Sequence, residues 1–166
     1  MKRYDDPRAL EASIVQRLRN RFGTDELGRR RSEVAYRRLI ARLAIAAPGR
    51  WVVKGGYGLI LRLDPNRMSN DIDVVFISAA GEHAAALAAL EAACAADLAD
   101  HFAFAITRVD EPDPTRACSV TIAARLGTRL WATFQVDLAV PRIDVPSTAL
   151  DAAPSLTGIP QVDELP

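Results

Sequence analysis

Along the first fifty residues, apolar side chains recur every three or four positions, which is the spacing of one face of a helix. Asp6-Pro7 has the residue types of a helix start, and Gly23 offers a helix end. A second stretch with the same spacing runs from about residue 25 to residue 46 and stops before Pro48-Gly49. The pattern therefore predicts two N-terminal helices, within residues 1–50, that pack on the rest of the chain.

After residue 50 the pattern changes to short apolar runs rich in β-branched residues, which indicates strands. An Ala- and Leu-rich stretch, residues 82–98, predicts a helix between them, and residues 58–63 predict a short one. Gly127-Thr128 has the composition of a hairpin connection. The expected strands cover residues 51–53, 72–77, 102–109, 118–124 and 131–140. The predicted fold class is α/β (α+β), with its core at residues 51–140.

Proline recurs through the last part of the chain, at positions 141, 146, 154, 160 and 166, with little apolar periodicity. We therefore expect residues 141–166 to form a proline-rich tail or connector outside the core. At 166 residues the chain has the length of one domain with one hydrophobic core. No apolar run approaches the roughly 18 residues that a membrane span needs, so the expected location is the cytoplasm, without a membrane.

The formal net charge of zero conceals a strong asymmetry. Residues 1–67 hold 16 Lys and Arg against seven Asp and Glu, whereas residues 68–166 hold five against 14. Five arginines of the second predicted helix lie largely off its apolar stripe: Arg30, Arg31, Arg37, Arg38 and Arg42. Two interpretations stay open: a basic surface for a polyanion beside an acidic half for a cation, or a solvated pair of basic helices.

Asp71 and Asp73 flank Ile72 at the start of a predicted strand. Residues i and i+2 of a strand point to the same face, so both carboxylates can serve one site. Two such groups repel each other unless a cation lies between them, and their oxygens suit Mg²⁺ or Mn²⁺. The pattern alone is not specific, because it also marks metal-dependent glycosyltransferases.

Asp137 lies inside the apolar run 134–140, in the same alternation phase as Gln135 and Ala139. A charge in such a strand costs several kcal/mol unless it is paired or metal-bound. If the strand is central and adjacent to the one that carries Asp73, Asp137 supplies a third metal-facing carboxylate. The alternative is an aspartate at a solvated sheet edge.

Lys54-Gly55-Gly56 follows the first predicted strand and precedes the predicted short helix. Glycine lets a phosphate approach the backbone closely, and the N–H groups at a helix start favour negative charge. Gly-Gly by itself is common in turns. Here the turn lies about fifteen residues before Asp71. It can therefore hold a triphosphate whose oxygens reach the same metal ions as the acids.

The motif K-G-G at residues 54–56, followed by R-x-S-x-D-x-D at residues 67–73, resembles the AbiEii/AbiGii nucleotidyltransferase toxin family. The MenT-type tRNA-modifying toxins belong to that family. The resemblance covers about residues 52–140 and implies a DNA polymerase β-like nucleotidyltransferase fold, a mixed β-sheet with flanking helices. It also implies metal ligation by Asp71 and Asp73, with Asp137 at the position of the third acid.

The same resemblance implies that Arg67 and Ser69 help to position nucleotide phosphates. Ser69 has an equally plain structural role, capping the turn that presents Asp71. Lys54 either contacts phosphate or is a solvated lysine at a strand end. Tyr57 stands where the family usually has Ser or Thr, so that phosphate contact is lost or is made through the phenol.

Related toxins continue into a helical half that carries a catalytic lysine and a further aspartate, whereas Lys2 and Lys54 are the only lysines here. The C-terminal helical half is therefore expected to be missing from this chain. The resemblance implies a metal-dependent nucleotidyltransferase, the toxin of a toxin–antitoxin system, that moves nucleotides from an NTP to the 3′ end of tRNA and has a cognate antitoxin. Two alternatives are a non-catalytic nucleotide- or antitoxin-binding remnant and a small-molecule, aminoglycoside-like nucleotidyltransferase.

Overall fold

The computed structural model describes residues 3–62, 69, 71–78, 82–110, 117–141 and 154–165. Both predicted N-terminal helices are present: α1 (Pro7–Phe22) and α2 (Leu27–Ala46). The carboxylate of Asp6 caps α1 by accepting hydrogen bonds from the backbone N–H groups of residues 8 and 9. Within the described part of the chain, no helix is long and apolar enough to cross a membrane.

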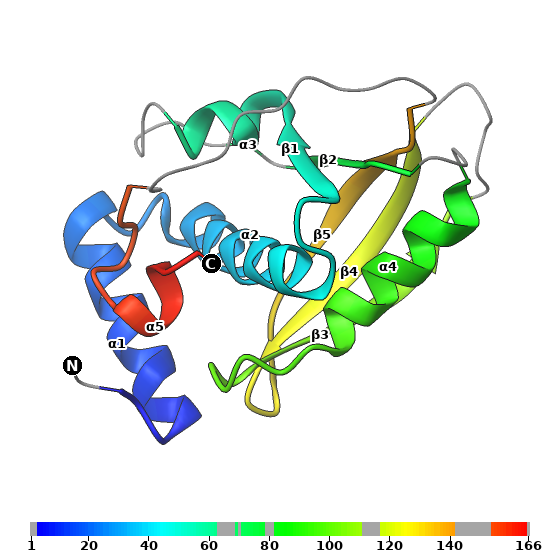
Figure 1. Cartoon of the computed structure of the whole chain (residues 1–166). Helices are drawn as coiled ribbons and strands as arrows, with labels where there is room; N and C mark the ends of the chain where they lie inside the picture. Colours follow the sequence, from blue (N-terminus) through cyan, green and yellow to red (C-terminus); the bar gives the residue numbers. More distant parts are fainter. Residues whose placement is uncertain are drawn as a thin grey trace.

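The five predicted strands form one mixed sheet with the order β1-β2-β5-β4-β3 (Figure 1). The strands are β1 (Trp51–Lys54), β2 (Ile72–Phe76), β3 (Phe102–Val109), β4 (Cys118–Leu126) and β5 (Arg129–Ala139). β2 and β5 run parallel, and the other neighbours run antiparallel. The mixed α/β class is thus confirmed, and β5 lies at the centre of the sheet.

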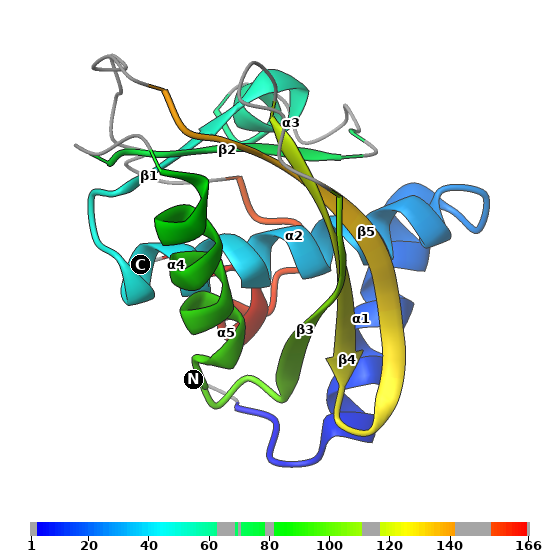
Figure 2. The same ribbon diagram turned by 90° about the vertical axis from the view of Figure 1, so that its right-hand side faces the viewer.

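The helices α2, α4 (His83–Ala95) and α5 (Pro160–Asp163) lie on one side of the strands β3, β4 and β5 (Figure 2). The side chains that face them alternate with more accessible ones along each strand, as in Val120 and Ile122 of β4 and Val136 and Leu138 of β5, all fully buried. One face of the sheet therefore makes the core, and the other carries polar and small side chains.

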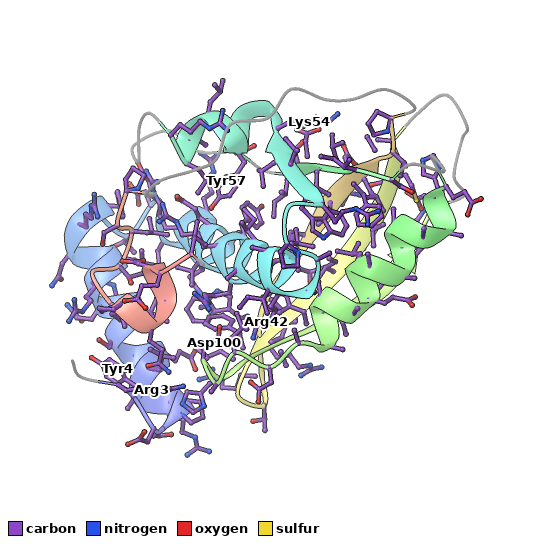
Figure 3. The ribbon with its side chains drawn as sticks, viewed as in Figure 1. Arg3, Tyr4, Arg42, Lys54, Tyr57 and Asp100 are labelled. Atoms are coloured by element: carbon purple, nitrogen blue, oxygen red, sulfur yellow. The ribbon has the colours of Figure 1, made fainter. Side chains whose placement is uncertain are left out.

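Four of the five arginines singled out on α2 are buried, so neither open interpretation, the polyanion-binding surface or the solvated basic helix, holds for them. Arg30, Arg37, Arg38 and Arg42 are at most 5% exposed. Arg42 (Figure 3) donates to both carboxylate oxygens of Asp100, at 2.8 and 3.0 Å. Arg38 donates to the same group at 2.6 Å. A buried guanidinium needs such a partner, and Asp100, ahead of β3, supplies it.

The prediction that residues 141–166 form a tail outside the core is wrong for residues 154–165. Leu156, Ile159 and Val162 are each at most 1% exposed and belong to the core. Arginines of α1 and α2 donate to the backbone carbonyls of this segment. These carbonyls thereby gain hydrogen-bond partners that neither a sheet nor a long helix provides here. These long-range partners leave no periodic signal in the sequence.

Candidate functional site

The two central parallel strands place Asp73 of β2 and Asp137 of β5 directly beside each other in the register. Their strand neighbours Val74 and Leu138, which are paired in the same way, are fully buried. The aspartates therefore point to the other face of the sheet, and both are partly accessible. β5 is central rather than an edge strand, so the solvated-edge interpretation of Asp137 is wrong.

Two further polar residues continue this row across the sheet. Lys54, at the end of β1, is the register partner of Asp73, and Ser119 of β4 is the register partner of Asp137. Directly opposed residues of neighbouring strands share a face, so the row places an ammonium and a hydroxyl on either side of the two carboxylates. The sequence did not single out Ser119, because its place beside Asp137 depends on the pairing of β4 with β5.

Asp71 lies just before β2 and is exposed. Its carboxylate accepts a hydrogen bond of 2.9 Å from the hydroxyl of Ser69. This contact matches the structural role that the sequence left open for Ser69. Arg67 lies outside the described residues.

The glycine turn begins α3 (Gly55–Ile60) rather than preceding it, so the helix starts three residues earlier than predicted. Gly55 has a φ of +65°, and a Cβ built on it would stand 2.0 Å from Oδ2 of Asp73. A Cβ on Gly56 would stand 3.5 Å from the hydroxyl of Ser69. The first residue of α3 therefore lies against the carboxylate of Asp73, where only glycine fits, and the second lies near the hydroxyl that donates to Asp71.

Tyr57 is 1% exposed, so of the two alternatives for this position the structure favours the one in which the phosphate contact is lost. Its side chain lies between α3 and α2 (Figure 3). The ring packs edge-on against Tyr36 of α2 at 5.3 Å between centroids, and the hydroxyl donates to the carbonyl of Glu33 at 3.4 Å. Burial raises the pKa of Tyr57 far above the usual tyrosine range. The residue follows the helical period of α3 with Ile60, which turns it to the core instead of the glycine side.

Tyr36 is a buried residue whose pKa is affected by Asp71 at the start of β2. Burial raises its pKa to about 12, and the negative charges of Asp71 and Glu33 add to that effect. The phenol is therefore neutral near pH 7 and cannot act as a base there. It connects the packing beneath α3 with β5, because its ring also meets Phe134 at 4.8 Å.

The donor set fits a hard divalent cation held by two protein groups. Among the described residues, no group of three or more His, Cys, Asp or Glu is gathered closely enough to hold a metal ion. The structure thus pairs Asp73 with Asp137 and leaves Asp71 with Ser69. Mg²⁺ usually takes only one or two carboxylates and completes its shell with water and substrate phosphates, so the adjacent pair suits it.

A mixed sheet that carries side-by-side aspartates on its central parallel strands, next to a helix that begins with two glycines, has the architecture of a nucleotidyltransferase core. A solved structure with the same fold is MenT4, a nucleotidyltransferase toxin from Mycobacterium tuberculosis H37Rv. The two share 17% identity at a TM-score of 0.57, over 78% of this chain and 43% of that one. The chain thus spans less than half the length of MenT4, and at this identity the similarity shows the fold alone.

Residues 38–161 match the family described as nucleotidyl transferase AbiEii toxin, type IV toxin–antitoxin system. The chain belongs to this family. No curated protein matches it.

Proposed function

We propose that the chain carries the catalytic core of a metal-dependent nucleotidyltransferase, the toxin of a toxin–antitoxin pair, which transfers a nucleotide from an NTP to a hydroxyl group. The observation that carries the proposal is the adjacency of Asp73 and Asp137 on the open face of the sheet. Family membership supplies the reaction class and implies a cognate antitoxin.

In the proposed reaction, the acceptor oxygen forms a bond to the α-phosphorus, and the bond from that phosphorus to the β-phosphate oxygen breaks. Pyrophosphate leaves, and the hydroxyl proton passes by way of a carboxylate oxygen of Asp137 to solvent. Bound Mg²⁺ or Mn²⁺ would be held by Asp73 and Asp137, with Asp71 assigned as a further ligand by family resemblance, and would neutralise phosphate charge. Asp73 would then bind the metal ion, and Asp137 would both bind the metal ion and accept the proton.

The nucleotide phosphates are assigned to the glycine end of α3. The backbone of Gly55 and Gly56 has no side chain to keep an anion away, and Gly55 adjoins the carboxylate of Asp73. Lys54 adds an exposed positive charge in the same row of the sheet. Ser69 orients Asp71 through its hydrogen bond and, with Arg67, is assigned to the phosphates by family resemblance.

The acceptor assigned by family resemblance is the 3′ end of tRNA. Four arginines of α2 cannot attract its backbone, because they are buried in ion pairs and carbonyl contacts. The basic groups available on the described surface are others, such as Arg8 and Arg19 of α1 and Lys54.

The test is incorporation of labelled nucleotide into total tRNA by the purified chain, with Mg²⁺ or with a chelator. We expect Asp71→Asn, Asp73→Asn and Asp137→Asn each to lower labelling at least a hundredfold. Asp5→Asn, at an exposed carboxylate before α1, is the matched control and should label as the wild type does. Equal labelling by all variants would reject the mechanism.

One structural observation favours a second candidate, a nucleotide-binding module without turnover. The described residues do not gather three acids around one point. In that case calorimetry would show binding of Mg²⁺-NTP while neither tRNA nor an aminoglycoside acceptor became labelled. Labelling of the aminoglycoside alone would instead identify a small-molecule transferase.

A further inference from the structure

A second polar row lies next to the aspartate pair on the same face of the sheet. Gln135 precedes Asp137 by two residues on β5 and therefore shares its face. Thr121 of β4 is the register partner of Gln135, and Arg108 of β3 is the register partner of Thr121. The row leads from the carboxylates to a guanidinium through two neutral hydrogen-bonding side chains.

Among the described residues, none of the helices packed on the sheet covers this face over the row. The helices α2, α4 and α5 lie on the opposite side of β3, β4 and β5 (Figure 2). Gln135 and Arg108 are exposed, and Thr121 is partly so. Thr133 and Ala123, the next pair along β5 and β4, are small and leave room beside the row on that side. A ligand can thus lie flat along it.

The length of the row and the arginine at its far end fit an extended anionic ligand. Arg108 is two strands away from Asp137, about 10 Å across the sheet, and about 7 Å along it. Its present partner is Asp110, at 2.7 Å in a pair whose side chains are 74% and 41% exposed. Exposed pairs of this kind contribute little, so a phosphate can replace the carboxylate. An acceptor that reaches both ends therefore carries a phosphate well away from its reacting hydroxyl.

The chemistry of the two middle residues fits a ribose chain. Glutamine and threonine offer neutral donors and acceptors, which pair with 2′-hydroxyl groups and base edges. A polycationic aminosugar would need carboxylates along its length, and Gln135, Thr121 and Arg108 offer none. The guanidinium at the far end favours a phosphodiester instead.

We infer that Gln135, Thr121 and Arg108 form a track along which the 3′-terminal nucleotides of a single-stranded RNA approach Asp137. Arg108 contacts a phosphate, and Gln135 and Thr121 bind ribose and base. The inference rests on the proposed function, because it names the residues that would position the acceptor at the same site.

The experiment measures equilibrium binding of a short fluorescent oligoribonucleotide with a free 3′-hydroxyl to the full chain, so it needs no turnover. The variants are Gln135→Leu with Thr121→Val, and Arg108→Gln. The controls, Gln16→Leu of α1 and Arg29→Gln of α2, make the corresponding Gln→Leu and Arg→Gln changes at exposed positions to which no binding role is assigned. Circular dichroism and thermal melting establish that every variant is folded.

We expect each track variant to bind RNA about tenfold more weakly and to bind NTP as the wild type does. Arg108→Gln should also reduce the slope of log Kd against log salt by about one. The Gln135/Thr121 double variant should lose preference for the oligoribonucleotide over the same deoxy sequence. RNA binding that is absent in the wild type, or equal in wild type and track variants, overturns the inference. Loss of RNA binding in the track variants, with no nucleotide transfer by the wild type, would reject the proposed function and keep the track.

Discussion

Gly55 lies directly against the carboxylate of Asp73. A Cβ built on the glycine would stand 2.0 Å from Oδ2 and 2.9 Å from Cγ of that aspartate. The glycine also has a φ of +65°, which L-residues with a side chain rarely adopt. The carboxylate of Asp73 therefore occupies the space that a side chain at position 55 would fill. It can keep its orientation only because residue 55 has no Cβ.

We predict that Gly55→Ala lowers nucleotide transfer far more than it lowers stability. The added methyl group must push the short carboxylate of Asp73 to another rotamer, while the positive φ costs about 1–2 kcal/mol. Gly49→Ala is the matched control, because Gly49 has a φ of +70° and nothing within 4 Å of its built Cβ. Urea unfolding should give similar losses for both variants, and labelling assays should show a loss only for Gly55→Ala. Equal activity of the two would mean that Asp73 need not keep this rotamer.

We predict that Asp137→Asn raises the melting temperature of the metal-free protein. Asp73 and Asp137 are register partners, so removing one charge relieves repulsion on the order of 1 kcal/mol at partly exposed positions. For a chain of this size that corresponds to about 2–4 °C. Added Mg²⁺ should raise the melting temperature of the wild type and not that of Asp137→Asn. A Mg²⁺ effect of the same size on both proteins would show that the pair does not hold the cation.

The sequence was sufficient for the strands, because they depend on local patterns, but not for the pairing of the acids: it grouped Asp71 with Asp73, whereas the register places Asp73 beside Asp137. Alternation along residues 131–140 predicted a strand, and a charge inside it predicted that Asp137 had a partner. The pairing that puts Asp73 beside Asp137, and Ser119 on its other side, needs the strand order. No local pattern contains that order.

The buried arginines show a different limit of sequence analysis. By periodicity Arg38 and Arg42 are on the polar side of a helix, and arginine is usually exposed. Their partners are Asp100, 58 or more residues away, and the carbonyls of residues 162 and 164. A segment with no apolar periodicity therefore completes the core, and its role depends on contacts that no window of the sequence can show.

We predict that Asp100→Asn destabilises the protein by about 3–5 kcal/mol, because it leaves two buried guanidinium groups without their counter-charge. Asp110→Asn is the control: it removes the exposed partner of Arg108 and should cost less than about 1 kcal/mol. Guanidinium chloride would screen charge, so urea unfolding is the measurement. A small effect of Asp100→Asn would show that water reaches this ion pair.

The same carboxylate predicts a pH dependence. Burial by itself raises the pKa of Asp100, but hydrogen bonds and charges from Arg42 and Arg38 outweigh it and hold that pKa below the usual range. Its contribution to stability is therefore complete above the pKa of an unfolded aspartate, near about 4, and is lost as the pH falls through the folded value. The difference in unfolding free energy between wild type and Asp100→Asn should stay constant from pH 7 to 5 and narrow below about pH 4. A difference that narrowed already between pH 7 and 5 would contradict the lowered pKa.

We predict that Asp163→Ala releases the C-terminal segment from the core. The carboxylate of Asp163 accepts hydrogen bonds from the backbone N–H groups of Thr157 and Gly158, at 2.7–3.1 Å, and from the hydroxyl of Ser155 at 2.6 Å. Hydrogen bonds to a charged group contribute about 1.5–3 kcal/mol each when buried, and these are partly exposed, so we expect a loss of about 2–4 kcal/mol. The matched control is Glu164→Ala, because the next side chain is exposed and only its backbone carbonyl binds Arg38.

Hydrogen exchange distinguishes local release from general weakening in Asp163→Ala. If the segment opens by itself, the amides of residues 157–163 lose protection while those of β4 and β5 keep it, because strand pairing in the sheet does not depend on Asp163. A uniform loss across Val120, Ile122 and the segment would mean instead that Leu156, Ile159 and Val162 are part of the same cooperative unit as the sheet. In either case Arg21, which is exposed, and Arg37, which is fully buried, lose acceptors among the carbonyls of residues 154–156. Protection equal to that of the wild type throughout would show that the carboxylate does not hold the segment.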